Sequence, residues 1–233
     1  MRLTVLRNDV RVPAGHLERV ARDRGIDVHT VELDAGASLP DLSDLGAVAV
    51  LGGGMGAYDT DRHAFLIDEK RWLASAAIAG VPILGLCLGC QLLADALGGR
   101  AYLATVPEVA FSPIDLVVDD PVVRHLSEGP VLTMHRDTWD LPDGAVLVAR
   151  SPSHHQAFRI FNALAIQPHP EVTPATARGW LTDPASGDIL SGAGAVGHQV
   201  ADRIDAAAPG IAATADAFFG AWLDEAASVQ DVE

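Results

Sequence analysis

Short apolar segments alternate with amphipathic segments along the first hundred residues. Leu3–Leu6, Leu45–Leu51 and Val81–Leu86 are apolar at nearly every position, which is typical of strands buried on both faces of a parallel sheet. Between them, apolar residues recur three or four positions apart, as on the buried side of a helix. Such segments predict helices at Pro13–Arg24, Arg62–Ala79 and Leu88–Leu97, whereas the alternation of apolar and polar residues over Val28–Leu33 predicts a strand. The alternation predicts a doubly wound α/β domain with a mostly parallel sheet.

The second half of the chain has a different pattern, in which strand candidates lie close together between turn-forming residues. They are Ile114–Val118, Val131–Met134, Ala145–Ala149, Gln156–Ile160 and Ala163–Gln167. We expect antiparallel strands that extend or flank the sheet. From Pro174 the pattern is helical again. The expected helices are Ala175–Leu181, Val196–Ala207 and Ile211–Ala227, with Thr182–Gly194 as a loop containing one short helix.

These patterns divide the 233 residues into three parts. We expect one α/β domain over residues 1–172, a helical extension packed on it over residues 173–228, and a disordered tail over residues 229–233. The last expected helix has an apolar stripe, made of Ala212, Ala215, Phe218, Phe219 and Trp222. We expect this stripe to join the core, and docking of a partner protein is the alternative.

Charge limits the functions that the chain can have. It has 31 Asp and Glu against 16 Lys and Arg, which gives a formal net charge of −15. Because nucleic acids and anionic membranes are bound by clustered cations, neither is expected as a partner. Lys70 is the only lysine and has no glycine-rich loop beside it, so neither an ATP-binding phosphate loop nor a cofactor is expected.

The same sequence gives an expectation about location. No apolar run approaches the roughly 18 residues of a membrane span. The first residues, which include Arg2 and Arg7, lack the long apolar run and cleavage site of a signal peptide. We therefore expect the protein to be cytoplasmic.

Both cysteines stand in one short segment, Gly85-Leu86-Cys87-Leu88-Gly89-Cys90-Gln91. A zinc site is one interpretation, but a structural site needs four ligands and the chain has no second cysteine pair. A redox pair is another, because a C-x-x-C motif at the start of a helix favours a thiolate. The third is a nucleophile at Cys87, with Cys90 packed inside.

The spacing of two glycines favours the nucleophile. Gly85 and Gly89 lie two residues to either side of Cys87, as in a strand that turns sharply into a helix. Such a turn exposes the side chain at the carboxyl edge of the sheet, where open α/β sheets bind ligands. The amide groups at the start of the helix stabilise a thiolate. A purely structural role for Cys87 remains the alternative.

A base and a residue that orients it follow the last expected strand, in Gln167-Pro168-His169-Pro170-Glu171. Pro170 favours an extended conformation at His169, and residues two apart in an extended segment point the same way. Glu171 can then bind one nitrogen of the ring while the other faces a thiol. The alternative is that His169 only satisfies a turn.

A glycine-rich loop, Leu51-Gly52-Gly53-Gly54-Met55-Gly56-Ala57-Tyr58-Asp59, follows another expected strand. Backbone amides in such a loop hold either a phosphate or the oxyanion of an acyl-transfer reaction. The absence of cations nearby favours the oxyanion, and a flexible turn is the alternative.

Together these segments resemble the class I glutamine amidotransferase family, whose motifs are G-x-C-x-G-x-Q, Q-x-H-P-E and a G-G-P loop. The resemblance extends from about Leu3 to Glu171 and is greatest to stand-alone, GMP synthase-like amidotransferases. It implies a flavodoxin-like fold. In the loop, Gly54 stands where the family commonly has proline, which predicts a more flexible loop that a partner or substrate orders.

The resemblance also implies roles for individual residues. Cys87 would attack the side-chain amide of glutamine, His169 would transfer protons, and Glu171 would orient His169. The amides of Gly53 and Leu88 would hold the oxyanion. The residues that would contact the substrate are Gln91, His135 and Asp137. No metal is implied.

Several functions fit these roles. The first is a glutaminase that passes ammonia to an unidentified acceptor or to a separate synthetase. The second is a γ-glutamyl hydrolase that acts alone on γ-glutamyl amides or peptides with the same residues. A catalytically silent regulatory protein is the alternative that is not an enzyme, and the presence of Cys87, His169 and Glu171 argues against it.

Overall fold

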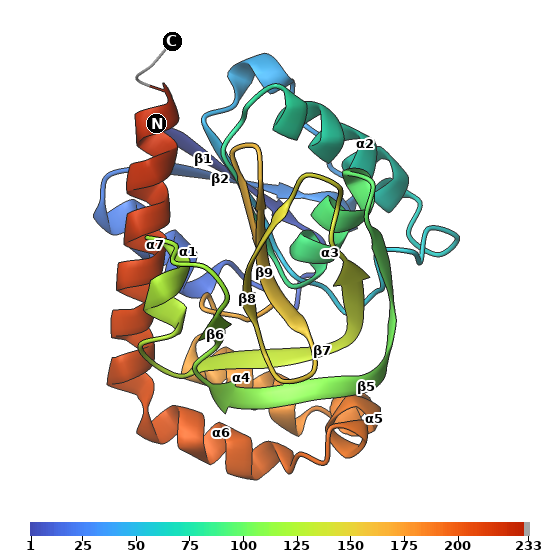
Figure 1. The fold of residues 1–233 in the computed structure, drawn as a ribbon, viewed down its shortest axis with the longest axis vertical. Coiled ribbons are helices and arrows are strands. Elements are labelled where there is room, and N and C mark those ends of the chain that lie inside the picture. Colours follow the sequence, from blue (N-terminus) through green and yellow to red (C-terminus); the bar gives the residue numbers. More distant parts are fainter. Residues whose placement is uncertain (231–233) are drawn as a thin grey trace.

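The computed structural model describes residues 1–230 and has an eight-stranded mixed sheet with helices on both faces (Figure 1). The strand order is β2-β1-β3-β4-β10-β9-β8-β6. The strands are β1 (Arg2–Arg7), β2 (Asp27–Glu32), β3 (Ala47–Val50), β4 (Ile83–Leu86), β6 (Asp115–Leu116), β8 (Val146–Arg150), β9 (His155–Ile160) and β10 (Ala163–Ile166). The mostly parallel, doubly wound fold is confirmed.

The parallel half of the sheet positions the ends of β1, β3, β4 and β10 along one edge. Alternate residues of each strand face opposite cores: in β3, Ala47 and Ala49 join one cluster and Val48 and Val50 the other. Helix α1 (Gly15–Asp23) packs on the first face, and α2 (Phe65–Ile78) and α3 (Leu88–Ala96) pack on the second. This burial on both faces explains why the strands are apolar throughout.

Strand β10 corrects one expectation. We expected the segment from Ala163 to Gln167 to be one of several antiparallel strands. It is antiparallel to β9 but parallel to β4, because the tight turn at Phe161 and Asn162 returns the chain into the middle of the sheet. The predicted antiparallel pairing holds for β6, β8 and β9.

The longest strand, β5 (Arg100–Ser112), was not predicted. It pairs with β7 (Val131–Asp140) in a separate two-stranded ribbon, which crosses the lower part of Figure 1. Most β5 side chains are half-buried or exposed, and the pairing register shifts between Leu103 and Glu108, beside Pro107. A strand with little apolar periodicity and an internal proline gives weak evidence in a sequence.

Residues 174–230 form a chain of helices: α4 (Pro174–Thr182), α5 (Gly187–Gly192), α6 (Gly197–Ala206) and α7 (Ala208–Gln230). Thr173 caps α4 by accepting a hydrogen bond from the Thr176 amide. Helix α7 runs beside α1 (Figure 1). Because α7 continues to Gln230, the expected tail is wrong for residues 229–230, while residues 231–233 lie outside the described part. The division between residues 172 and 173 stays a prediction.

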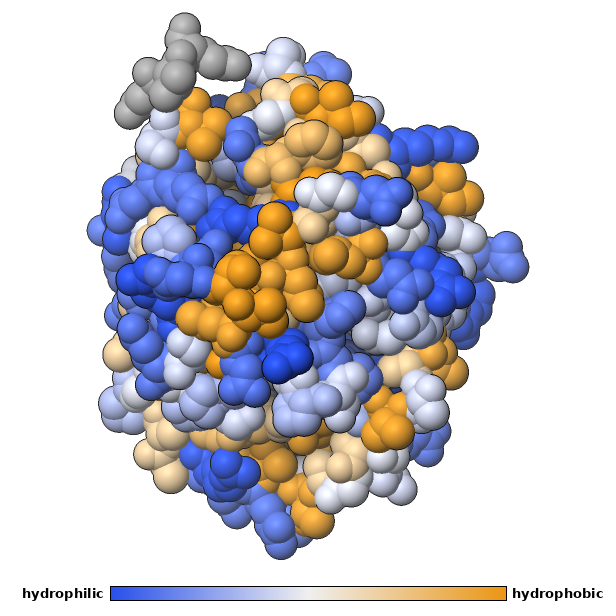
Figure 2. Space-filling model, in the orientation of Figure 1, coloured by the Kyte–Doolittle hydropathy of each residue, from blue (hydrophilic) through white to orange (hydrophobic). Residues whose placement is uncertain are grey.

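Exposed apolar side chains gather in the middle of the face shown in Figure 2, where Figure 1 places β6, β8 and β9. Val117, Val118 and Val146 are the exposed valines of these strands and their connection. They lie toward the β6 edge of the sheet, away from the carboxyl ends of β3 and β4. Among the helices of residues 1–230, none is both long and apolar enough to cross a membrane.

Candidate active site

Cys87 lies at the sharp turn between β4 and α3. Its backbone has a φ of 51° and a ψ of −104°, a conformation that few residues other than glycine adopt. The amide of Cys87 donates to the carbonyl of Ile166 in β10, at 2.9 Å, which fixes the turn against the sheet. A Cβ atom at Gly89 would collide with the carbonyl oxygen of Val50, so glycine there allows α3 to approach the sheet. The predicted strand-to-helix turn is present.

The two cysteines have different surroundings. The Cys87 side chain reaches a pocket, whereas Cys90 is completely buried among the apolar residues between α3 and the sheet. Burial raises the pKa of the Cys90 thiol well above its usual value, and the neighbouring Cys87 adds to this effect. Both are free thiols. The geometry therefore favours a nucleophile at Cys87 over a paired metal or redox site.

His169 and Glu171 lie together as expected, but the chain forms a turn there and not an extended segment, because the Val172 amide donates to the His169 carbonyl at 3.4 Å. The Nδ1 atom of His169 is 2.7 Å from Oε1 of Glu171, and both side chains are buried. The His169 amide donates to the Leu132 carbonyl of β7, at 2.8 Å. Burial alone would lower the pKa of His169, but the charges of Glu171 and Cys87 hold it well above its usual value. The site thus favours an imidazolium between an acid and a sulfur.

The side chains of Cys87 and His169 converge on Gly52. A Cβ atom at Gly52 would lie 3.4 Å from Cε1 of His169 and 3.5 Å from Cβ of Cys87. The Nε2 atom of Gln167 donates to Sγ of Cys87 at 3.4 Å. Residues from three separate strand ends are therefore brought to one point.

The expected oxyanion residues are neighbours. A Cβ atom at Gly53 would lie 2.6 Å from Sδ of Met55 and 2.7 Å from Cδ2 of Leu88. Leu88 is the first residue of α3, so its amide has no acceptor within the helix. Glycine at position 53 lets the loop lie against the start of the helix that follows Cys87.

These groups surround a pocket of about 360 Å³. Six of the eight residues expected at the site line it: Gly53, Cys87, Gln91, His135, Asp137 and His169. The two others are buried behind it: Leu88 contributes through its backbone and Glu171 through His169. The structure therefore brings all the predicted residues together, and their chemical roles stay predictions.

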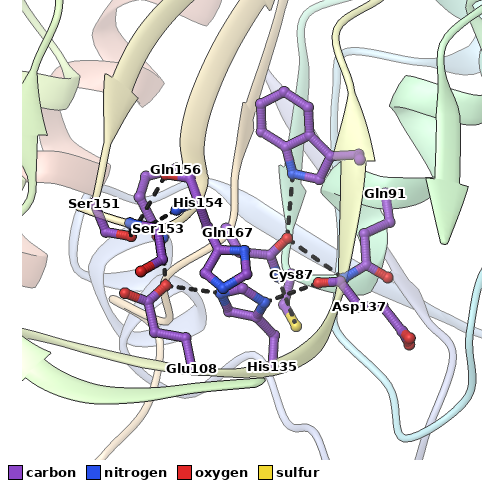
Figure 3. A network of polar contacts seen from close by, with 11 residues as sticks. Cys87, Gln91, Glu108, His135, Asp137, Ser151, Ser153, His154, Gln156 and Gln167 are labelled. Atoms are coloured by element: carbon purple, nitrogen blue, oxygen red, sulfur yellow. Dashed lines mark hydrogen bonds and ion pairs between the residues drawn. The ribbon is translucent and has the colours of Figure 1, made fainter. Parts of the chain in front are cut away.

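A buried polar network continues from Cys87 (Figure 3). The Gln167 side-chain oxygen accepts from Nε1 of Trp139 at 3.2 Å and from Nε2 of Gln91 at 3.4 Å. Gln91 also donates to the carbonyl of Asp137, at 3.4 Å. Gln167 is thereby held in the orientation that presents its amide nitrogen to the sulfur.

His135 has a buried partner on each side of its ring. Its Nδ1 lies 2.8 Å from the carbonyl of Asp137, and its Nε2 lies 3.0 Å from Oε2 of Glu108 on β5. Because a carbonyl can only accept, Nδ1 carries a hydrogen. Although burial raises the pKa of Glu108, hydrogen bonds from His135 and Ser151 hold it below its usual value. The Glu108 carboxylate thus stands within hydrogen-bond distance of Nε2 of His135.

Several residues of the site were not predicted. Gln167 stands at the head of the histidine motif, which was a usable signal, whereas Glu108 lies on the unpredicted strand β5. Asp9 and Arg11, which follow β1, and Trp180 on α4 also line the pocket. Nothing in the local sequence around these three residues indicates that they meet the cysteine.

Comparison with known proteins identifies the family. The sequence model described as "Glutamine amidotransferase class-I" matches residues 15–183, which is most of the chain. The chain belongs to the class I glutamine amidotransferase family. The motifs around Cys87 and His169 thus lie in the region that defines the family.

Individual amidotransferases show the same relationship. A GMP synthase (glutamine-hydrolyzing) from Prochlorococcus marinus is 30% identical over 163 residues, covering 66% of this chain and 30% of that protein. The chain therefore spans about a third of the length of this relative. The crystal structure of a glutamine amidotransferase from Thermotoga maritima has a TM-score of 0.83 at 25% identity, covering 95% of this chain and 97% of the other.

A glutamine amidotransferase structure from Methylobacillus flagellatus has a TM-score of 0.84 at 22% identity, covering 96% of this chain and 94% of the other. Coverage above nine-tenths in both structures includes the helical segment after Glu171. The amidotransferase fold of this chain thus includes its C-terminal helices.

Proposed function

We propose that the protein is a glutaminase in which Cys87 is the nucleophile, His169 the acid and base, and Glu171 the residue that orients His169. The observation that supports this is the convergence of Cys87, the His169–Glu171 pair and the loop that carries Gly53 on one pocket. Each of these groups supplies a separate requirement of acyl transfer. Gln91, His135 and Asp137 would contact or shape the site for the rest of the substrate.

The proposed reaction has two steps. The Cys87 thiolate attacks the side-chain carbonyl carbon of glutamine, and the oxyanion is held by the amides of Gly53 and Leu88. As the carbon–nitrogen bond breaks, the imidazolium of His169 gives its proton to the leaving nitrogen, which departs as ammonia. Water then attacks the thioester while His169 takes a proton from it. Glutamate and the Cys87 thiolate are released, and His169 is an imidazolium again.

The proposal also includes the fate of the ammonia. The GMP synthase relative aligns with this chain over 30% of its own length, so the rest of that protein lies outside the alignment. We propose that ammonia passes to an unidentified synthetase partner or acceptor. The competing proposal, a γ-glutamyl hydrolase, is supported by the pocket of about 360 Å³, which has room for more than the ten non-hydrogen atoms of glutamine.

The first test is ammonia release from glutamine by the purified protein. Cys87→Ala should abolish release without unfolding the protein, because only the nucleophile is lost. Cys90→Ala is the matched control: its side chain is buried in the core, so we expect a lower melting temperature and nearly unchanged kcat. Equal loss of activity in both variants would instead indicate a redox or metal pair.

If the wild-type protein releases no ammonia, labelling with a glutamine-like electrophile distinguishes the remaining functions. Labelling of Cys87 would indicate a competent site that requires a partner or a different γ-glutamyl substrate. Absence of labelling would support the catalytically silent protein and contradict the proposal.

A further inference from the structure

A carboxylate outside the proposed catalytic residues holds the loop that carries Gly53. Asp9 follows β1 and is 7% exposed. Its Oδ2 atom accepts a hydrogen bond from the amide of Gly54 at 3.1 Å. Gly54 is the residue after Gly53, so this bond fixes the peptide next to the proposed oxyanion amide. A proline at position 54 has no N–H and could not make this contact.

Arg11 holds Asp9 in place. Its Nε lies 3.0 Å from Oδ1 and its Nη2 lies 2.6 Å from Oδ2, while its backbone amide donates to Oδ1 at 3.0 Å. Burial raises the pKa of Asp9, but the bonds from Arg11 and Gly54 outweigh this and hold the pKa below its usual value. A Cβ atom at Gly54 would lie 2.5 Å from Nη2 of Arg11, so glycine leaves the space that the guanidinium occupies.

The same short segment also contacts the neighbour of His169. Nε1 of Trp180, on α4, donates to the carbonyl of Arg11 at 2.9 Å. The Trp180 ring packs edge-on against His169, with 5.1 Å between ring centroids and 70° between planes. Residues 9–11 therefore link the loop at Gly54 to the packing around His169.

We propose that Asp9 is a positioning residue that braces the oxyanion loop through Gly54 and, with Arg11 and Trp180, holds that loop in a fixed position relative to His169. This rests on the proposed function. Asp9 and Arg11 precede the residues that the family's sequence model matches, which begin at Gly15. Because an oxyanion hole works only when its donors are already in place, the brace should affect the chemical step more than substrate binding.

A second anchor holds the far end of the loop, where the Tyr58 hydroxyl donates to Oδ1 of Asp137 at 2.8 Å. Loss of Asp9 should therefore loosen the segment around Gly54 without releasing the whole loop. We expect Asp9→Ala to lower kcat about 10- to 100-fold with less than about a threefold change in KM, somewhat less than the loss of an oxyanion donor itself. Asp9→Asn keeps an oxygen for the Gly54 amide and should restore kcat to within about fivefold of wild type.

Asp34 provides a matched control. Its carboxylate binds the guanidinium of Arg7 at 3.0 Å, and both side chains are 18% exposed. Asp34 does not line the pocket. Asp34→Ala loses a comparable ion pair and should keep the wild-type kcat. A similar fall in kcat in Asp34→Ala would mean that Asp9 acts only through stability, which would overturn the brace.

A double-mutant cycle tests the contact itself. Gly54→Pro removes the N–H, so adding Asp9→Ala to it should cause little further loss of kcat. Independent, multiplying losses would overturn the proposal. If Gly54→Pro does not fold, hydrogen exchange in Asp9→Ala tests the contact, because it needs no substitution at Gly54.

Amide hydrogen exchange of residues 51–57 measures the brace without turnover. Exchange should be faster in Asp9→Ala than in Asp34→Ala or wild type, and equal rates would overturn the brace. A wild-type protein that neither releases ammonia nor is labelled at Cys87 would contradict the proposed function alone, while faster loop exchange in Asp9→Ala would still support the brace.

Discussion

Several residues at the site have conformations or surroundings that few other residues tolerate. Cys87 has a positive φ, and Gly53 lies where a side chain would strike Met55 and Leu88. His169 is buried between Glu171 and the pocket. These constraints fix the positions of the Cys87 thiol, the His169 ring and the backbone at Gly53. Such preorganisation is what an acyl-transfer site needs.

Glu69, on α2, is a further buried acid behind the glycine-rich loop. It is fully buried, and its Oε1 accepts from Nδ2 of Asn8 at 3.2 Å, while the same nitrogen lies 3.4 Å from the carbonyl of Leu51. Burial raises the pKa of Glu69 to about 8, although the hydrogen bond from Asn8 lowers it. The carboxyl group is therefore protonated in the folded protein at neutral pH.

This pKa predicts a pH dependence of stability. Unfolding exposes Glu69 and returns its pKa to about 4.5, so between that pH and about 8 the folded state binds more protons than the unfolded state. The stabilising contribution is complete at low pH. It is lost as the pH rises through this window, by at most about 1.4 kcal/mol per pH unit.

The measurement is urea unfolding of Glu69→Gln and wild type between pH 5 and pH 9. The amide cannot ionise, so the variant should lose less stability than wild type as the pH rises. Asp68→Asn, an exposed position on the same helix, is the control and should follow wild type. Parallel curves for Glu69→Gln and wild type would contradict the prediction.

At the scale of elements, the junction of β4 and α3 does most to form the site. Helix α3 starts immediately after Cys87 and packs closely on β3 through Gly89. The spacing of Gly85, Cys87 and Gly89 predicted this junction, because close approach of helix and strand excludes side chains there. The need for small residues at this junction involves only neighbouring positions in the chain, so the sequence alone reveals the junction.

The close packing at this junction predicts opposite stability changes for two glycine-to-alanine substitutions. Gly89→Ala would push a methyl group into the carbonyl oxygen of Val50, so we expect a lower melting temperature and reduced ammonia release. Gly210→Ala, on α7, has nothing within 4 Å of the added Cβ and should raise stability by up to about 1 kcal/mol through helix propensity. Thermal unfolding of both variants tests this, and equal shifts would argue against close packing at Gly89.

The β5–β7 ribbon shows where element prediction from sequence stopped. Its strands lie outside the main sheet. Because β5 is largely half-exposed, it shows no clear apolar pattern, and of β7 only the start, Val131–Met134, was predicted. Yet Glu108 on β5 and His135 on β7 meet beside the pocket. A pairing between residues that are 27 positions apart leaves no trace in local periodicity.

At the scale of the molecule, the C-terminal helices both complete the core and form one wall of the pocket. Phe218, Phe219 and Trp222 on α7 are buried against the face of the sheet that α1 covers. The core interpretation of this stripe is therefore confirmed over the docking surface. Trp180 and Asp183 line the pocket from the preceding helical segment.

Burial of the stripe predicts a large effect on folding. Phe218→Ala should destabilise the protein by about 3–5 kcal/mol, as expected for an aromatic side chain that is lost from a packed core. Ala212→Ser, also on α7 but only half-buried, is a control with a small expected effect. Urea unfolding provides the measurement. A loss below about 1 kcal/mol for Phe218→Ala would mean that α7 contributes little to the core.

The sequence by itself determined the features that depend on nearby residues. Apolar runs indicated strands buried on both faces, glycines around Cys87 indicated a sharp turn, and the His169-Pro170-Glu171 segment indicated a histidine beside a carboxylate. Each follows from local backbone geometry and from the requirement to bury apolar surface.

The tertiary structure alone decided which distant segments meet. It placed β10 parallel to β4, brought Gln167 to the Cys87 sulfur, and set Asp9 against Gly54. It also seated Trp180 of the helical extension on His169. The residues joined by the hydrogen bond to Gly54 are 45 positions apart, and those joined by the hydrogen bond to Cys87 are 80 positions apart. No local pattern encodes these contacts, because they arise only when the whole chain packs around its two cores.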